Sequence, residues 1–433
     1  MRKAIWFSVL AAVAGISGAV SSVRSSEGVA AKSREVLAEA HIRDQDIDFY
    51  RARVRRDPRS AGDFTRLAGL YLQRARQTAD NGDLIRAEQN ARHSLRLRTG
   101  RNAAAFGVLA SSLLAQHRFE AAMTVAQQLV AADSTSVAAL GLLAETQYEL
   151  GRYPEAGRTL GGLATYRTDP SVTPRLARWA ELHGRPEEAR RLLRAGRDEA
   201  LRRHGVPKEQ LAWYHLRLGD LALRYGHLDE ATAELRAGLS VSPEDYRLLG
   251  TLARVQSARR RWQEAIECGE LAIRHALDPA TLGVIGEAYA ALGDSSKAEE
   301  YYHTMETVVL HQPGPFHRAW SLFLLDHDRD VPRVLANVEE EIRTRQDIYG
   351  YDLLAWALHQ SGRDLEARKA MAHALALGTH DALLFYHAGM IERGLGDAQS
   401  ARYYLRAALE TNPYWHPLQP DRARAVADSL DGR

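Results

Sequence analysis

The chain has 433 residues, of which 45% are hydrophobic and 26% charged, a balance typical of folded proteins and too apolar for a disordered chain. Its 57 basic and 55 acidic residues leave a formal net charge of +2, which gives no support to a general nucleic-acid-binding role. The single cysteine, Cys268, excludes an intramolecular disulfide.

Residues 1–23 combine a basic start with an apolar run. Arg2 and Lys3 precede residues 4–23, which carry no charged side chain. Together with the small residues around Ala19, this pattern predicts a secretory signal peptide. The run is also about long enough to be a retained membrane anchor, so membrane contact is expected only if the segment stays on the protein. We therefore expect an exported chain, either periplasmic or secreted, or alternatively anchored in the inner membrane and facing the periplasm.

Residues 24–60 are expected to form capping helices in front of a repeat stack. Residues 31–43 and 44–56 can each form a helix, and Asp57-Pro58 ends the second one because proline cannot continue a helix. The first repeat of a stack needs such a cap, since its outer face has no neighbouring repeat.

A small residue followed twelve positions later by an alanine recurs along the rest of the chain. Most of the first members lie 33 or 34 residues apart. This period predicts a stack of helix–turn–helix units, each of which buries its apolar face against its neighbours. Small side chains suit the places where two helices cross closely. The pairs are Ala110/Ala122, Ala144/Ala156, Ala177/Ala189, Gly219/Ala231, Ala253/Ala265, Gly286/Ala298, Ala355/Ala367 and Gly389/Ala401.

These repeats divide into two predicted blocks, residues 61–312 and residues 313–413. The predicted break is a Pro-Gly-Pro run that starts at Pro313. Residues 414–433 are expected to form a C-terminal capping helix that covers the open end of the last repeat. The fold class is therefore expected to be an all-α, right-handed superhelical solenoid of about ten repeats.

The repeat pattern resembles the tetratricopeptide repeat family over residues 60–413. Two units carry a small residue in the first helix, a turn glycine, an alanine in the second helix and a closing proline. These residues are Leu218-Gly219, Gly226, Ala231 and Pro243 in one unit, and Ala388-Gly389, Gly396, Ala401 and Pro413 in the other. Residues 381–413 are also similar to the terminal repeat of uncharacterised, exported bacterial proteins of this family. The resemblance implies a protein partner bound along a concave face.

The first helices of the repeats line that concave face in the family, so residues one turn from the packing pairs are the predicted binding residues. Aromatic, arginine and methionine side chains are typical of peptide-binding grooves. The candidates are Trp213, Asp220, Arg224, Arg247, Arg254, Tyr349, Asp352, Trp356, His359, Tyr386, Met390 and Arg393. For Trp356 and Tyr386, packing between adjacent repeats is the alternative interpretation.

Sequence motifs for catalysis or for metal binding are missing. The chain holds no HExxH, GxxxxGK[ST] or GxSxG motif and no Cys/His cluster with zinc spacing. We therefore expect no catalytic residue, no cofactor and no metal.

The expected function is a non-catalytic scaffold or adaptor of the bacterial cell envelope, with a peptide or a partner helix in the concave groove and no nucleic acid. One alternative is an accessory subunit of an envelope enzyme or assembly machine. Another is an enzyme with an unrecognised site. Convergent, buried ionisable residues would favour the enzyme, whereas a groove with exposed aromatic side chains would favour binding.

Overall fold

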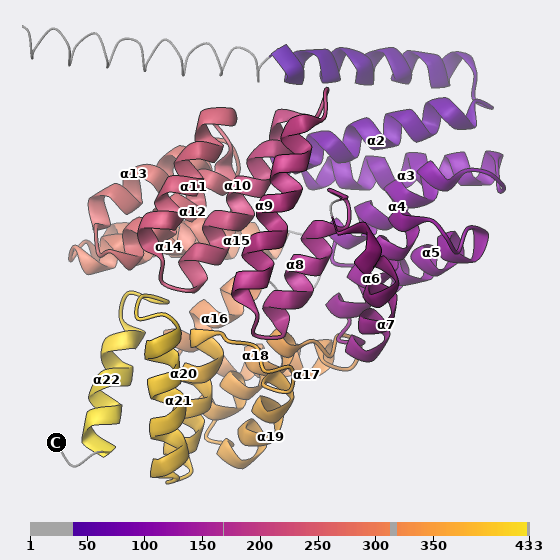
Figure 1. Cartoon of the computed structure of the whole chain (residues 1–433). Coiled ribbons are helices and arrows are strands. Elements are labelled where there is room, and N and C mark those ends of the chain that lie inside the picture. Colours follow the sequence, from indigo (N-terminus) through magenta and orange to yellow (C-terminus); the bar gives the residue numbers. More distant parts are fainter. Residues whose placement is uncertain (1–37, 168, 312–317, 431–433) are drawn as a thin grey trace, which may run out of the picture.

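A computed structural model describes residues 38–167, 169–311 and 318–430, and within these ranges the regular structure is helical throughout (Figure 1). Ten antiparallel hairpins follow one another in these ranges, which confirms the predicted all-α repeat fold. The hairpins are α2 (Ala61–Thr78) with α3 (Asn81–Leu97), α4 (Ala103–Ala115) with α5 (Phe119–Ala132), α6 (Val137–Glu149) with α7 (Tyr153–Leu163), α8 (Thr173–Leu182) with α9 (Pro186–Arg202), α10 (Lys208–Arg224) with α11 (Leu228–Val241), α12 (Tyr246–Ala258) with α13 (Trp262–Ile273), α14 (Pro279–Ala291) with α15 (Ser295–His311), α16 (Arg318–Asp326) with α17 (Val331–Glu341), α18 (Ile348–Gln360) with α19 (Asp364–Ala374), and α20 (Ala382–Gly394) with α21 (Ala398–Thr411).

One unbroken helix over residues 38–56 precedes the hairpins. The expected break before Asp44 is wrong: no glycine or proline interrupts the segment, and the Asp44 carboxylate accepts hydrogen bonds from Arg43 and Arg74 instead of capping a new helix. Ile47 packs into one cluster with residues of α2. The predicted signal segment, residues 1–23, lies outside the described residues.

The recurring small residues lie where the two helices of a hairpin cross. Ala110 and Ala122 have no exposed surface, and the same holds for Ala253 and Ala265. At Gly286, an added Cβ would lie 2.4 Å from Cε1 of Tyr302 on the second helix of the same hairpin. Close helix crossing therefore explains the small-residue period, as the sequence predicted.

Two glycine substitutions test this explanation. We expect Gly286→Ala to lower the free energy of unfolding by about 1–3 kcal/mol, because the Tyr302 ring must move. Gly107→Ala, in α4, should raise it by about 0.5–1 kcal/mol, because alanine favours helix and nothing lies within 4 Å of the added Cβ. Urea unfolding followed by circular dichroism measures both changes, and a stabilised Gly286→Ala protein would contradict the close crossing.

The stack turns back so that its last hairpins lie against the turns of earlier ones (Figure 1). We call α6–α13 the first layer and α17–α22 the second layer, where α22 is the last helix (Gln419–Leu430). Hydrogen bonds join residues 189 to 197 positions apart across this interface. We call these bonds the layer contacts: Gln346 N to Leu150 O (3.3 Å), Ile348 N to Tyr153 Oη (2.9 Å), Thr379 Oγ1 to Leu182 O, and Asn412 Nδ2 to Leu223 O (3.0 Å).

Three turn glycines allow the layers to approach closely. Gly151, Gly184 and Gly226 have φ values of +75°, +66° and +73°. A Cβ added at these positions would lie 2.1, 2.4 and 2.9 Å, respectively, from atoms of the second layer. The corresponding turn glycines Gly293 and Gly362 have no such atom within 4 Å. Only some turns of the stack are therefore pressed against another part of the chain.

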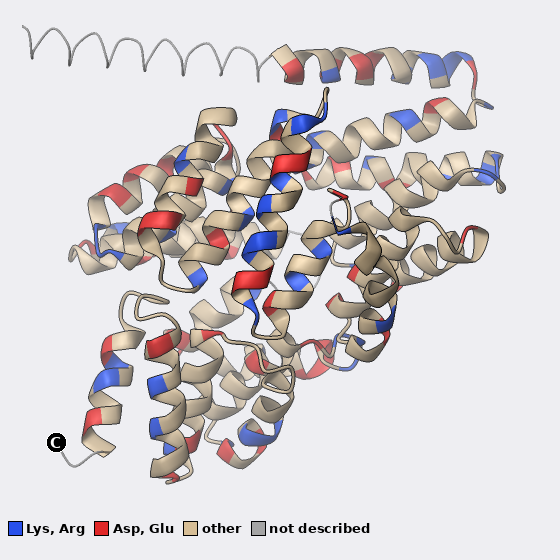
Figure 2. Cartoon of the chain, in the orientation of Figure 1, with Lys and Arg blue, Asp and Glu red and all other residues tan. Residues whose placement is uncertain are grey.

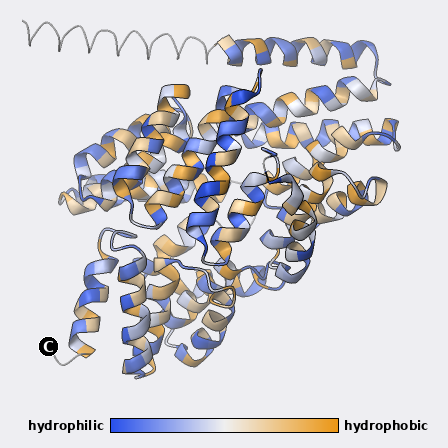
Figure 3. Ribbon diagram, viewed as in Figure 1, coloured by the Kyte–Doolittle hydropathy of each residue, from blue (hydrophilic) through white to orange (hydrophobic). Residues whose placement is uncertain are grey.

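The predicted break at Pro313 lies outside the described residues. On its two sides, Leu282 and Tyr302 belong to the same hydrophobic cluster as Phe323 and Tyr386, so the two predicted blocks share a core. None of the helices in the described ranges has the length and apolar character needed to span a membrane. Hydrophobic residues instead recur along helices that also carry polar ones (Figure 3).

Candidate functional site: a cavity between the layers

A cavity of about 510 Å³ lies between the two layers, and α14–α16 close one side of it. This volume is in the range of ordinary ligand sites, about 300–1,000 Å³. Its polar wall contains five arginines, Arg178, Arg224, Arg254, Arg318 and Arg345. Its apolar wall includes Val284, Leu322, Phe323, Leu383 and Trp415. The cavity therefore offers cationic and apolar contacts side by side.

An arginine cluster forms the cationic end of the cavity. Its members are Arg178, Arg217, Arg224, Arg254, Glu181 and Asp220. Glu181 accepts hydrogen bonds from Arg178 and Arg224, each at 3.0 Å. Asp220 accepts from Arg217 and Arg224 at 3.1 Å and from Arg254 at 3.2 Å. Four guanidinium groups thus share two carboxylates, which leaves an excess of two positive charges.

Both carboxylates of the arginine cluster stay ionised. Burial raises the pKa of Asp220, but the positive charges of Arg224, Arg217 and Arg254 outweigh burial and hold this pKa well below its usual range. The pKa of Glu181 is likewise lowered, because Arg224, Arg178 and Arg217 outweigh its burial. Neither carboxyl group can therefore act as a proton donor near neutral pH.

Tyr349, at the start of α18, lies between two arginines from different helices. The guanidinium carbons of Arg178 and Arg318 lie 5.3 and 5.2 Å from its ring centroid, which are cation–π distances. Burial raises the pKa of the Tyr349 hydroxyl, so that it stays protonated. In the described part of the chain this hydroxyl has no hydrogen-bond partner, and it is available as a donor beside the arginine cluster.

The structure brings three of the twelve predicted site residues to the cavity wall: Arg224, Arg254 and Tyr349. Asp220 lies behind them and binds both arginines. The remaining predicted residues on other surfaces are Trp213, Arg247, His359 and Arg393, none of which lines the cavity. Arg247 pairs with Asp245 at the start of its own helix, which accounts for its position without a ligand.

Four predicted residues belong to the core instead of a groove: Asp352, Trp356, Tyr386 and Met390 are 0–2% exposed. The Trp356 ring stacks on His387, with centroids 4.2 Å apart, and its Nε1 donates to Asp326 at 3.0 Å. Tyr386 and Met390 belong to the same hydrophobic cluster. The prediction that these four residues contact a ligand in an open groove is therefore wrong, because neighbouring helices, α16 among them, pack over them. The packing interpretation is the one that describes Trp356 and Tyr386.

Sequence reasoning missed three arginines of the wall, Arg178, Arg318 and Arg345. A signal existed for Arg178, because it directly follows Ala177 as Arg254 follows Ala253. In these two repeats, the residue that directly follows the small residue of the first helix thus lines the cavity. Arg318, Arg345 and Trp415 reach the cavity only because the stack turns back, and no local pattern indicates that.

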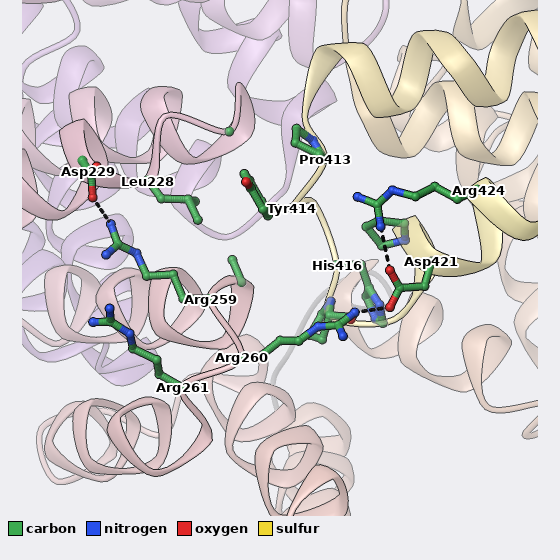
Figure 4. A pocket seen from close by; sticks show the side chains of 14 residues that line it. Leu228, Asp229, Arg259, Arg260, Arg261, Pro413, Tyr414, His416, Asp421 and Arg424 are labelled. Carbon is green, nitrogen blue, oxygen red and sulfur yellow. Dashed lines mark hydrogen bonds and ion pairs between the residues drawn. The ribbon is translucent and has the colours of Figure 1, made fainter.

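A second groove, of about 660 Å³, adjoins the cavity, and Figure 4 shows the side chains that line this groove. Tyr414, His416 and Pro417 line both the groove and the cavity, so this segment forms a wall between them. Arg260 fixes the wall: it donates to the Pro417 carbonyl at 2.9 Å and pairs with Asp421 on α22 (Figure 4). Elsewhere, basic and acidic side chains are interspersed over both layers (Figure 2).

Comparison with known proteins finds a family match for one part of the chain. Residues 113–174 match the family model described as a tetratricopeptide repeat. No curated protein matches the chain.

Similar solved structures include a tetratricopeptide repeat protein from Parabacteroides merdae, with 15% identity over 55% of this chain and 92% of that one, at a TM-score of 0.39. PilW, a type IV pilus biogenesis factor, shares 18% identity over 52% and 99% of the two chains, at a TM-score of 0.41. PilF of Pseudomonas aeruginosa shares 16% over 66% and 99%, at 0.32. The family match over residues 113–174 agrees with the repeat period and with the stacked hairpins, as expected for a chain that resembles tetratricopeptide repeat proteins.

Proposed function

We propose that this protein is a non-catalytic interaction scaffold or adaptor of the bacterial cell envelope, and that it binds an extended segment of a partner protein in the cavity between its layers. The observation that carries the proposal is the cavity itself, where arginines in excess adjoin an apolar wall. Proteins use this combination to bind peptides. The envelope location is supported by the basic and apolar pattern of residues 1–23.

Convergent ionisable residues, which would favour an enzyme, do occur in the cavity. General acid–base catalysis needs a group whose pKa lies near the working pH. The carboxylates of the arginine cluster are instead held ionised by their partners, and their pKa values lie below the ordinary range. This chemistry supports binding of a charged group over proton transfer.

A photo-crosslinking experiment tests the proposal in cells. We place p-benzoylphenylalanine at Tyr414, which lines the cavity, or at Tyr403, which is 67% exposed on α21 and lies outside the cavity. Both sites already hold a partly exposed aromatic ring, so the fold should tolerate both changes. We expect a defined protein adduct in the envelope fraction from position 414 that is missing from position 403. Identical adducts from both positions, or no adduct from position 414, would refute the proposal.

A further inference from the structure

We propose that the cavity recognises an acidic segment, with a carboxylate side chain of the bound peptide held by Arg224, Arg254 and the hydroxyl of Tyr349. The inference rests on the proposed function and adds the chemistry of the ligand. It follows from three features of the cavity: an excess of positive charge at the arginine cluster, donors without a protein acceptor, and an adjoining apolar surface.

Each acidic residue of the cavity wall already has a hydrogen-bond or ion-pair partner within the protein. Glu287 pairs with His327 at 3.1 Å, and Asp326 accepts hydrogen bonds from Trp356 and Gln419. Asp381 accepts from two backbone amides at the start of α20. The arginine cluster, by contrast, has two more guanidinium groups than carboxylates. Asp326 and Asp381 are bound by neutral donors among the described residues, so the positive excess is confined to the arginine cluster. At that end of the cavity an incoming anion would complete the ion pairing.

The nearby carboxyl group of Glu149 does not remove this imbalance. It interacts with Arg178, and burial raises its pKa above the ordinary value. The Glu149 carboxylate is also paired with Arg345, at 3.8 Å. Neither Arg224 nor Arg254 has a direct contact with Glu149 among the described residues.

Two side chains at the wall, Arg254 and Tyr349, have hydrogen-bond donors that are not used within the described part of the chain. The Arg254 side chain is 44% exposed, and its one hydrogen bond in the described part of the chain is to Asp220. A guanidinium group carries five N–H donors, so most of them face the cavity or solvent. The Tyr349 hydroxyl adds a neutral donor whose ring is fixed between Arg178 and Arg318. A carboxylate accepts several such bonds at once.

The apolar wall distinguishes a peptide from a small anion. Leu322, Phe323 and Trp415 line the same cavity as the arginines, so a bound segment can bury an apolar side chain beside its carboxylate. Inorganic phosphate would use only the charged end. The cavity volume of about 510 Å³ suits a few residues of an extended chain, in the ordinary range of ligand sites.

Fluorescence anisotropy tests the inference on the full chain. The probes are a fluorescein-labelled short peptide that alternates glutamate with leucine and a counterpart with glutamine in place of every glutamate. We expect the acidic peptide to bind at least about tenfold more tightly, as one or two charge-assisted hydrogen bonds would give. Arg254→Gln should weaken its binding by about tenfold and Tyr349→Phe by about fivefold. Tyr349→Phe retains the ring and both cation contacts, so it stays informative if Arg254→Gln perturbs folding.

Arg194→Gln is the matched control. Its side chain is 48% exposed and pairs with Glu230, and Arg194 lines no part of the cavity, so binding should not change. Equal binding of both peptides would overturn acidic recognition while leaving peptide binding intact. Equal loss in the control, unchanged affinity in both cavity variants, or complete competition by inorganic phosphate at the peptide's own concentration would also overturn it. If neither peptide binds, the acidic inference fails, and crosslinking from position 414 decides the scaffold proposal independently.

Discussion

Replacing Asp352 with alanine is expected to lower the free energy of unfolding by about 3–5 kcal/mol, because it leaves the buried His387 ring without its hydrogen-bond acceptor and Arg318 without its ion-pair partner. The Asp352 side chain has no exposed surface. One carboxylate oxygen accepts from Arg318 at 2.6 Å and the other accepts from Nδ1 of His387 at 2.7 Å. His387 is also fully buried, so its ring cannot recover the lost bond from water. The change therefore affects α16, α18 and α20 together.

A surface ion pair provides the control for Asp352→Ala. Glu340, near the end of α17, and Arg343, in the turn that follows, are paired at 2.8 Å, with both side chains 72% exposed. Exposed pairs of this kind contribute little, so Glu340→Ala should cost less than about 0.5 kcal/mol. Urea unfolding followed by circular dichroism gives both values. Comparable losses in the two variants would show that burial does not decide the effect.

The same carboxylate predicts a pH dependence. Burial raises the pKa of Asp352, but the charges and hydrogen bonds of His387 and Arg318 outweigh burial and lower it below its ordinary value of 3.8. A lowered pKa in the folded state means that the stabilisation is present above 3.8 and is lost as the pH falls through the folded-state value. The stability difference between the wild type and Asp352→Asn should therefore shrink below that pH. A constant difference would contradict the assignment.

The repeat period predicted the fold because each small residue acts locally. Ala253 and Ala265 lie twelve positions apart in sequence and both are fully buried at one helix crossing. The same local reasoning placed Arg224 and Arg254 on first helices, and these residues line the cavity. Residue positions that are set by one hairpin and its neighbours could therefore be predicted from the sequence.

The contacts of the second layer could not be predicted from the sequence in this way. A concave-face residue and a core residue can occupy the same position in a repeat, and only the elements that pack over that position distinguish them. Trp356 and Tyr386 are buried because α16, α22 and the segment before α22 pack over them. The layer contacts join residues almost 200 positions apart, and no spacing within a repeat specifies them. Gly151 and Gly293 also look alike in sequence, since each opens the turn of its repeat.

The difference between those two glycines leads to the second large effect. Both have a positive φ, +75° at Gly151 and +85° at Gly293, so alanine costs about 1 kcal/mol at either position from backbone strain alone. At Gly293 nothing lies within 4 Å of the added Cβ. At Gly151 the Cβ would lie 2.1 Å from the carbonyl oxygen of Gln346, so that the turn must move away from the second layer. We expect about 2 kcal/mol of additional loss there, from steric strain and the broken layer contact.

Two measurements separate local strain from loss of the layer contact. Urea unfolding should give a loss of about 3 kcal/mol for Gly151→Ala against about 1 kcal/mol for Gly293→Ala. Hydrogen exchange should become faster at the amides of Gln346 and Ile348 in Gly151→Ala only, because these amides donate to Leu150 and Tyr153 across the layers. Equal stability losses with unchanged exchange would mean that the layers do not press on this turn. Faster exchange confined to Gly151→Ala would show that a turn glycine holds together parts of the chain that no single repeat connects.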